Sequence, residues 1–205
     1  MDEESKPKPT LPQFYLRGFA DDAQQITTVR LPEEEPSIEA IQKSPSEIEG
    51  SAASVLRAIE SGAWPLPKEH RGTLAAFIAA QGGGGPDHLP SIVGRPWKLF
   101  RFQRRSLITC DSPVGLVAAP DAQTSEGVGF PTAWAITFPL TRRLGLVMGD
   151  VTPLTEANVP LERVRAGEFD AAEPGTTIMQ KFINESTEQS AGEYLYHHPD
   201  DASQI

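Results

Sequence analysis

The chain has only one cysteine, Cys110, and it lacks a long apolar run. These two features restrict the class of protein. A single cysteine excludes an internal disulfide bond and fits a reducing compartment, so we expect a cytoplasmic protein. No apolar stretch approaches the roughly 20 residues that a membrane-spanning helix needs, so we expect no membrane segment. The first residues, Met1 to Pro7, are acidic and polar, which is not the pattern of a signal peptide.

Basic residues are also scarce relative to acidic ones. The sequence has 18 Lys and Arg against 28 Asp and Glu, which leaves a formal net charge of -10. Because clustered cations hold a phosphate backbone, we do not expect nucleic acid as a partner. The 39% of hydrophobic residues and the length of 205 residues are typical of one globular domain.

The N-terminal residues differ in composition from the rest of the chain. Residues 1–12 are charged and contain Pro7, Pro9 and Pro12, so they predict a disordered tail. Residues 13–201 then predict a single domain. No repeat or linker of low complexity divides it, apart from one run of four glycines.

Helical periodicity appears in three segments. Apolar residues spaced three and four positions apart predict helices over about 46–61, 67–81 and 177–196. Gly82–Gly85 must end the second helix, because glycine costs about 1 kcal/mol per helical position relative to alanine. This run predicts a flexible tether without a packing surface, either natural or an engineered replacement of a longer segment.

Strand patterns begin at residue 26 and dominate after Arg95. Residues 26–31 predict one early strand. Residues 96–102 and 106–110 predict a hairpin around the loop 103–105. A second hairpin is predicted from residues 134–140 and 144–148, in which Pro139 should lie on an edge strand or at a bulge. We therefore expect an α+β fold in which three helices pack on one face of a small antiparallel sheet.

The segment from Arg95 to Arg105 combines cations with aromatic residues. It holds five cations and no anion, and Trp97 and two phenylalanines lie between the charges. Arg101, Arg104 and Trp97 are therefore candidate ligand-binding residues, for an anion or for a stacked base. Alternatively, these cations prevent aggregation at a sheet edge and pair with the protein's own carboxylates.

Two aspartates, Asp111 and Asp150, follow apolar strands that themselves follow basic turns. If both leave the sheet at the same edge, they are candidate catalytic residues, as an acid and a base or as metal ligands. The structural alternative is that each opens an ordinary turn, with its carboxylate accepting from nearby backbone amides. Cys110 is more simply a buried, inert thiol, because no motif supplies a base that would lower its pKa.

No cofactor or metal is expected from the remaining polar clusters. His197, His198, Asp200 and Asp201 lie close together in sequence. On a helix, however, neighbouring histidines point about 100° apart, which is a poor arrangement for joint chelation.

Three sequence blocks suggest a family. They are Pro12–Ala20, Thr109–Val114 and Phe138–Thr141, and they resemble members of the bacterial domain-of-unknown-function family 4238. Two positions depart from the family pattern, since Pro9 stands where members usually have a histidine and Cys110 stands where they usually have a serine.

The resemblance also implies a difference in length. Members carry a long helical region between the helix that ends here at Gln81 and the strand at Trp97, where this chain has its four glycines. The resemblance therefore implies an internally shortened member that lacks part of a helical layer. It implies no activity.

Three hypotheses on function follow. The first is a non-catalytic interaction or binding module with an unknown protein partner, because the sequence contains no complete triad, phosphate-binding loop or metal motif. The second is a hydrolase, with or without a metal, that uses the two strand-end aspartates. The third is a component of a defence system or a toxin, which residue patterns do not separate from the other two.

Overall fold

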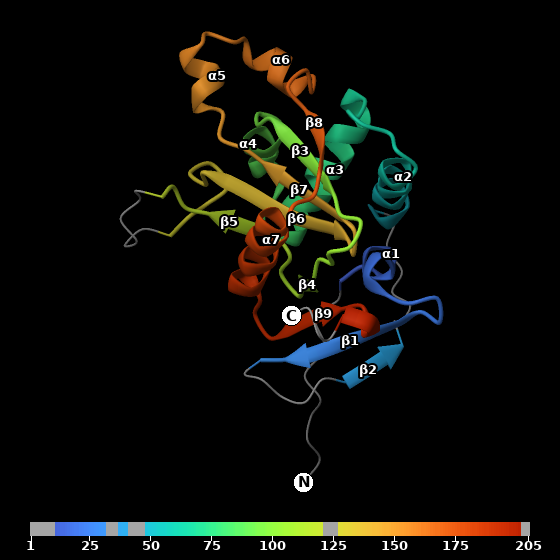
Figure 1. The fold of residues 1–205 in the computed structure, drawn as a ribbon. Coiled ribbons are helices and arrows are strands. Elements are labelled where there is room, and N and C mark those ends of the chain that lie inside the picture. Colours follow the sequence, from blue (N-terminus) through green and yellow to red (C-terminus); the bar gives the residue numbers. More distant parts are fainter. Residues whose placement is uncertain (1–10, 32–36, 41–47, 121–126, 202–205) are drawn as a thin grey trace.

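The computed structural model describes residues 11–31, 37–40, 48–120 and 127–201 (Figure 1). These residues form two β-sheets and several helices, which confirms the predicted α+β class. Most of the predicted tail, residues 1–10, lies outside the described residues, as do the first two positions of the predicted helix 46–61. Leu11, which the sequence assigned to the tail, is buried in the core.

The larger sheet has five strands in the order β5-β6-β7-β3-β8. Its strands are β3 (Trp97–Arg101), β5 (Gly115–Val117), β6 (Ala135–Thr141), β7 (Leu144–Met148) and β8 (Ala171–Pro174). The hairpin β6–β7 confirms the second predicted hairpin, and its register shifts between Pro139 and Thr141. Pro139 thus lies at the predicted bulge, where its missing N–H group costs no regular ladder bond.

The first predicted hairpin is wrong. β3 pairs antiparallel with β7 on one side and parallel with β8 on the other, so neither edge remains for the following strand. The backbone amides of Phe102 and Leu107 donate instead to the carbonyls of Arg143 and Arg142, each at 2.9 Å. The chain between them therefore crosses from the larger sheet to the smaller one.

The smaller sheet is antiparallel, with the order β2-β1-β9-β4. Its strands are β1 (Gln25–Arg30), β2 (Ser37–Ala40), β4 (Thr109–Cys110) and β9 (Tyr194–His197). β1 confirms the predicted early strand. β9 corrects the predicted helix 177–196, because α7 (Thr177–Ser190) ends at Ser190 and Ala191 is already extended.

The other helical segments are α1 (Gln13–Leu16), η1 (Arg17–Phe19), α2 (Ile48–Glu60), α3 (Lys68–Gln81), η2 (Pro86–His88), α4 (Leu89–Val93), α5 (Thr152–Glu156), α6 (Leu161–Arg165) and η3 (Pro199–Asp201). α3 confirms the second predicted helix, and α2 confirms the first over its described part.

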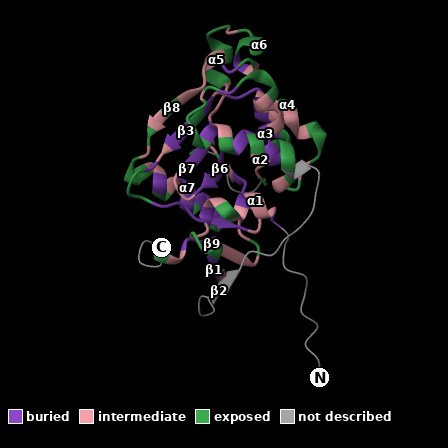
Figure 2. Ribbon diagram, turned by 90° about the vertical axis from the view of Figure 1, so that its right-hand side faces the viewer, coloured by how far each residue is buried: buried purple, intermediate pink, exposed green. Residues whose placement is uncertain are grey.

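Helices cover both faces of the larger sheet, so the prediction that they share one face is wrong. In Figures 1 and 2, α7 lies on one side of β6 and β7, while α2, α3 and α4 lie on the other. All seven residues of β6 are buried, as expected for a strand that is covered on both faces. The smaller sheet lies below this layered body (Figure 1).

The three sequence blocks that suggested a family meet at one buried junction between the two sheets. The Tyr15 hydroxyl donates to the carbonyl of Pro139 at 2.7 Å, and it shares a 2.7 Å hydrogen bond with the hydroxyl of Thr109. The amide of Arg142 donates to the carbonyl of Gly18 at 2.7 Å. These blocks therefore have a structural role, which is to join β4, β6 and the α1 segment.

Two of the four glycines in the run, Gly82 and Gly84, are packed against aromatic rings. A Cβ atom on Gly82 would lie 2.6 Å from the ring of Phe130, and one on Gly84 would clash with the ring of His88. Gly83 has a φ of +68°, a conformation that favours glycine. The predicted tether without a packing surface is therefore wrong at Gly82 and Gly84, whereas Gly83 and Gly85 are exposed and border open space.

No helix among the described residues is long and apolar enough to cross a lipid bilayer.

Candidate functional site

One cavity lies where two parallel strands end. It has a volume of about 650 Å³ and opens beside the carboxyl ends of β3 and β8 and the start of α7. We call it the arginine pocket, and its lining residues are Arg101, Phe102, Gln103, Arg104, Arg105, Ala172, Glu173, Pro174, Gly175, Thr176 and Thr177. Binding sites of α/β proteins often occupy such a position, because the carboxyl ends of parallel strands meet at one sheet edge.

One close backbone contact shapes the floor of the pocket. The parallel register pairs Arg101 with Pro174, and the next amide, that of Gly175, donates to the carbonyl of Arg101 at 2.7 Å. A Cβ atom on Gly175 would overlap the ring of Phe102, so only glycine lets the chain pass this ring. Phe102 is itself buried and forms part of the apolar core beneath the pocket.

The cationic wall comes from the loop after β3. Gln103, Arg104 and Arg105 are exposed, and the guanidinium of Arg143 fixes the loop by donating to the carbonyl of Arg105 at 2.7 Å. Among the described residues, the side chains of Arg104 and Arg105 make no ion pair. Both guanidinium groups are therefore available to a ligand.

Two other charged side chains of the pocket, Arg101 and Glu173, already have partners within the protein. Arg101 donates to the carbonyl of Ile59, at the end of α2, at 2.9 Å. Glu173 forms an ion pair with Lys98 at 2.9 Å, and both side chains are about half exposed, so this pair adds little stability. The Lys98 ammonium offsets the carboxylate of Glu173, which leaves the pocket with an excess of positive charge.

The start of α7 forms the opposite wall. Thr176 is the N-cap, and its hydroxyl accepts from the amide of Met179 at 3.2 Å. The first amides of a helix lack carbonyl partners within the helix, and the helix dipole makes this end positive. Thr177 therefore adds polar donors to the same cavity without adding a side-chain charge.

Two of the three predicted ligand-binding residues, Arg101 and Arg104, line this pocket, but Trp97 does not. Trp97 is fully buried, its indole N–H donates to the carbonyl of Ile92 at 3.0 Å, and the Arg71 guanidinium lies 4.1 Å from the ring centroid. Trp97 is therefore not available to stack on a ligand, because β3 lies inside the sheet and this side chain faces the core.

The two predicted catalytic aspartates do not share a sheet edge. Asp111 follows β4 in the smaller sheet, whereas Asp150 follows β7 in the larger one. The Asp111 carboxylate accepts from the backbone amides of residues 192, 193 and 194 at 2.8, 2.7 and 3.3 Å. Asp150 accepts from the amide and hydroxyl of Thr152 at 3.0 and 2.9 Å. Both carboxylates therefore have structural roles: Asp150 stabilises its own turn, and Asp111 holds the distant segment 192–194.

The Asp111 contacts also explain the end of α7. They hold the chain just after Ala191, so that it turns and enters β9 beside β4. In this way a residue of the second sequence block determines where the last helix ends.

The polar cluster near residue 200 also serves packing. Asp201 is buried and accepts both hydrogen bonds of a bidentate pair with Arg142, each at 2.7 Å. The Nδ1 atom of His197 contacts the carbonyl of His198 at 2.8 Å. Within the described part of the chain, no group of three or more His, Cys, Asp or Glu side chains is arranged to hold a metal ion.

Cys110 is predicted to be chemically inert in the folded protein. Its side chain is fully buried, and burial raises the pKa of the thiol to about 11. At neutral pH the reactive thiolate is therefore scarce and shielded from solvent. We expect Ellman's reagent to label Cys110 slowly in buffer and rapidly in denaturant, and equally rapid labelling in both conditions would contradict this burial.

The β8–α7 side of the pocket was not predicted from the sequence. β8 is short and lacks a clear apolar alternation, so its pairing with β3 has no signal in the sequence. The available signal was Thr176, which precedes a periodic segment and has the side chain of an N-cap.

Comparison with known proteins adds a family but no activity. The chain matches the family model described as a protein of unknown function (DUF4238) over residues 85–201. No curated protein and no solved structure matches the chain. The match spans more than half of the sequence, including every strand of the larger sheet and the whole arginine pocket. The chain belongs to the DUF4238 family.

Proposed function

We propose that this protein is a binding module without chemistry of its own and that the arginine pocket holds a small anionic ligand. The observation that carries the proposal is the meeting of three arginines in one cavity of a chain whose net charge is -10. We also propose a bacterial protein in a cytoplasmic setting, and the single cysteine supports the reducing compartment.

The size and chemistry of the pocket favour a small ligand. Its volume of about 650 Å³ lies within the usual range for small-molecule sites. Guanidinium groups bind carboxylates and phosphates through paired N–H donors, and such charged hydrogen bonds are stronger than neutral ones. The positive end of α7 adds to the same preference for an anion.

A peptide that extends the sheet is a poorer fit. On the outer edge of β8, alternation leaves the amide of Ala172 facing outward, while Pro174 has no N–H group to offer. An added strand would gain few main-chain hydrogen bonds there.

We do not propose hydrolysis. Asp111 accepts hydrogen bonds from the distant backbone of residues 192–194, and Asp150 accepts from Thr152 in its own turn. The two aspartates also follow strands of different sheets, so the reason for pairing them as catalytic residues no longer holds.

Calorimetric titration with inorganic phosphate and with citrate tests the proposal. We expect saturable binding to the wild-type chain, and at least a tenfold loss of affinity in the double variant Arg104→Gln/Arg105→Gln, because each charged hydrogen bond contributes about 1.5–3 kcal/mol. The matched control is Lys68→Gln/Lys181→Gln, which removes the same charge from exposed positions outside the pocket.

The control variant distinguishes binding in the arginine pocket from binding driven by the net charge of the protein. The proposal predicts that the control variant binds within about twofold of wild type. An equal loss in both variants would mean that net charge alone drives binding. If neither anion binds the wild type at millimolar concentration, the proposed function is wrong.

A further inference from the structure

A second cavity lies between α1, α2 and the end of β6. Its volume is about 310 Å³, and none of its lining residues belongs to the arginine pocket. We call it the α2 cavity and define it by Phe14, Leu56 and Leu140, which form an apolar floor, and by Arg17, Arg57 and Glu60, which supply its charges. Nothing in the arginine pocket proposal depends on it.

The floor of the α2 cavity is held by the hydrophobic core. Leu56 and Leu140 are buried, and the partly buried ring of Phe14 packs on the ring of Phe77 with centroids 5.3 Å apart. A second wall is backbone and methyl surface at Gly18 and Thr141, which are in close contact with each other. Such packing gives the cavity a preformed shape, as is usual for small-ligand sites.

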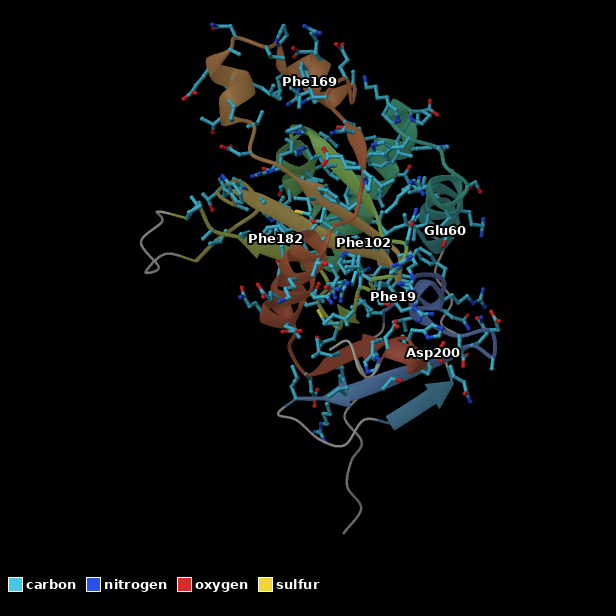
Figure 3. All side chains as sticks on the ribbon, in the orientation of Figure 1. Phe19, Glu60, Phe102, Phe169, Phe182 and Asp200 are labelled. Carbon is cyan, nitrogen blue, oxygen red and sulfur yellow. The ribbon has the colours of Figure 1, made fainter. Side chains whose placement is uncertain are left out.

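The charged groups of the α2 cavity have opposite signs. Arg17 is exposed, and its side chain makes no ion pair or hydrogen bond with any described residue. Arg57 and Glu60 lie three residues apart on α2, so their side chains share one face of the helix. Figure 3 shows Glu60 at the end of α2 that lies beside α1.

Glu60 is an exposed residue whose carboxyl lies beside the cavity and near the charge of Arg57. Partial burial raises the pKa of the Glu60 carboxyl, and the charge of Arg57 lowers it by less, so the net shift is upward. A carboxylate in this condition gains from any further cation placed beside it. The guanidinium of Arg17 would in the same way gain from an anion placed beside it.

We propose that the α2 cavity binds a small zwitterion with an apolar side chain, of the class of apolar α-amino acids. The ligand carboxylate contacts Arg17 and Arg57, its ammonium contacts Glu60, and its side chain covers the apolar floor. The volume of about 310 Å³ is at the lower end of the range for small-ligand sites, about 300–1,000 Å³, and suits a ligand of this size.

A zwitterion fits better than a simple carboxylic acid. A ligand with only a carboxylate would meet the two arginines but would also bring a second negative charge toward Glu60. A ligand with only an amine would face the two guanidinium groups. Only a ligand with both charges satisfies all three side chains while it removes apolar surface from water.

Titration with three related compounds tests this inference. They are L-phenylalanine, 3-phenylpropanoate, which lacks the ammonium, and 2-phenylethylamine, which lacks the carboxylate. We expect L-phenylalanine to bind in a saturable manner and each analogue to bind at least tenfold more weakly. Calorimetry or ligand-observed NMR provides the affinities.

Two variants test which protein side chain contacts each charged group of the ligand. Glu60→Gln should weaken L-phenylalanine binding about tenfold and leave 3-phenylpropanoate binding unchanged or stronger. Arg17→Gln should weaken binding of both carboxylates and spare 2-phenylethylamine. The matched control Glu69→Gln, an exposed glutamate on α3 outside the cavity, should change no affinity by more than about twofold.

Several outcomes would overturn the inference. If 3-phenylpropanoate binds as tightly as L-phenylalanine, or if Glu60→Gln leaves L-phenylalanine binding unchanged, the ligand class is wrong. If none of the three compounds binds at millimolar concentration, the site is wrong. A loss of L-phenylalanine binding in Arg104→Gln/Arg105→Gln would place the compound in the arginine pocket instead. Unchanged binding in that variant supports two separate sites, whatever the result with phosphate and citrate.

Discussion

Replacement of Asp170 by alanine is expected to lower the free energy of unfolding by about 3–5 kcal/mol, the usual cost of removing one partner of a buried ion pair. The side chains of Asp170 and Arg71 are 0% and 1% exposed, and the Nε atom of Arg71 lies 2.8 Å from the carboxylate. Without Asp170, the guanidinium would stay buried with its charge uncompensated.

The same pair holds several segments together. Asp170 also accepts from the amide of Trp97 at 2.8 Å, at the start of β3. Arg71, on α3, donates in addition to the carbonyls of Val93 and Arg95 at 2.7 and 2.6 Å. Because Asp170 directly precedes β8, its loss should also weaken the alignment of β8 with β3 on which the arginine pocket depends.

Urea unfolding followed by circular dichroism measures this effect. The control is Glu168→Ala, which breaks the exposed pair of Arg163 and Glu168, with side chains 54% and 46% exposed. An exposed pair contributes at most about 1 kcal/mol, so the control should cost far less than Asp170→Ala. Equal losses in the two variants would show that the Asp170 pair does not have the stabilising role assigned to it.

Replacement of Tyr15 by phenylalanine is expected to cost about 1–3 kcal/mol at neutral pH, because the buried groups at Thr109 and Pro139 lose their hydrogen-bond partner. The ring itself remains and keeps its contacts with the rings of Phe77 and Phe138, whose centroids lie 5.9 and 5.4 Å away. The loss therefore reports on the hydroxyl that joins the three sequence blocks.

The same variant should change the response to alkaline pH. Burial is the largest cause that raises the pKa of Tyr15 well above its usual value of 10.0, and burial also raises the pKa of Cys110, to about 11. Folding thus favours the protonated form of both groups. Their contribution to stability is complete below the pKa values of the unfolded chain and is lost as the pH rises above them.

The stabilising contribution of Cys110 is lost between about pH 9 and about pH 11, and that of Tyr15 begins to be lost near pH 10. The wild type should therefore lose stability above pH 9, and Tyr15→Phe should lose less over the same range because one of the two groups is absent. Unfolding free energies in urea at pH 7, 9 and 10.5 measure the difference. Parallel losses in both proteins would contradict a buried, protonated Tyr15.

The part of the candidate site that could be predicted from the sequence is the part that lies on one continuous segment. Arg101 and Arg104 stood out because five cations without an anion are unusual in an acidic chain. Trp97 was misassigned because a sequence does not state whether an aromatic residue on a strand faces solvent or core. Asp111 and Asp150 were grouped by similar local contexts, yet their strands entered different sheets.

By itself the sequence determined the α+β class, the helix at 68–81 and the hairpin with its bulge at Pro139, because spacing and turn residues act over a few neighbouring positions. Only the tertiary structure decided that β3 lies between β7 and β8, that Asp111 ends α7, and that Arg104 faces the start of α7 across a cavity. These outcomes depend on hydrogen bonds and packing between residues far apart in the chain, and local periodicity contains no information about such partners.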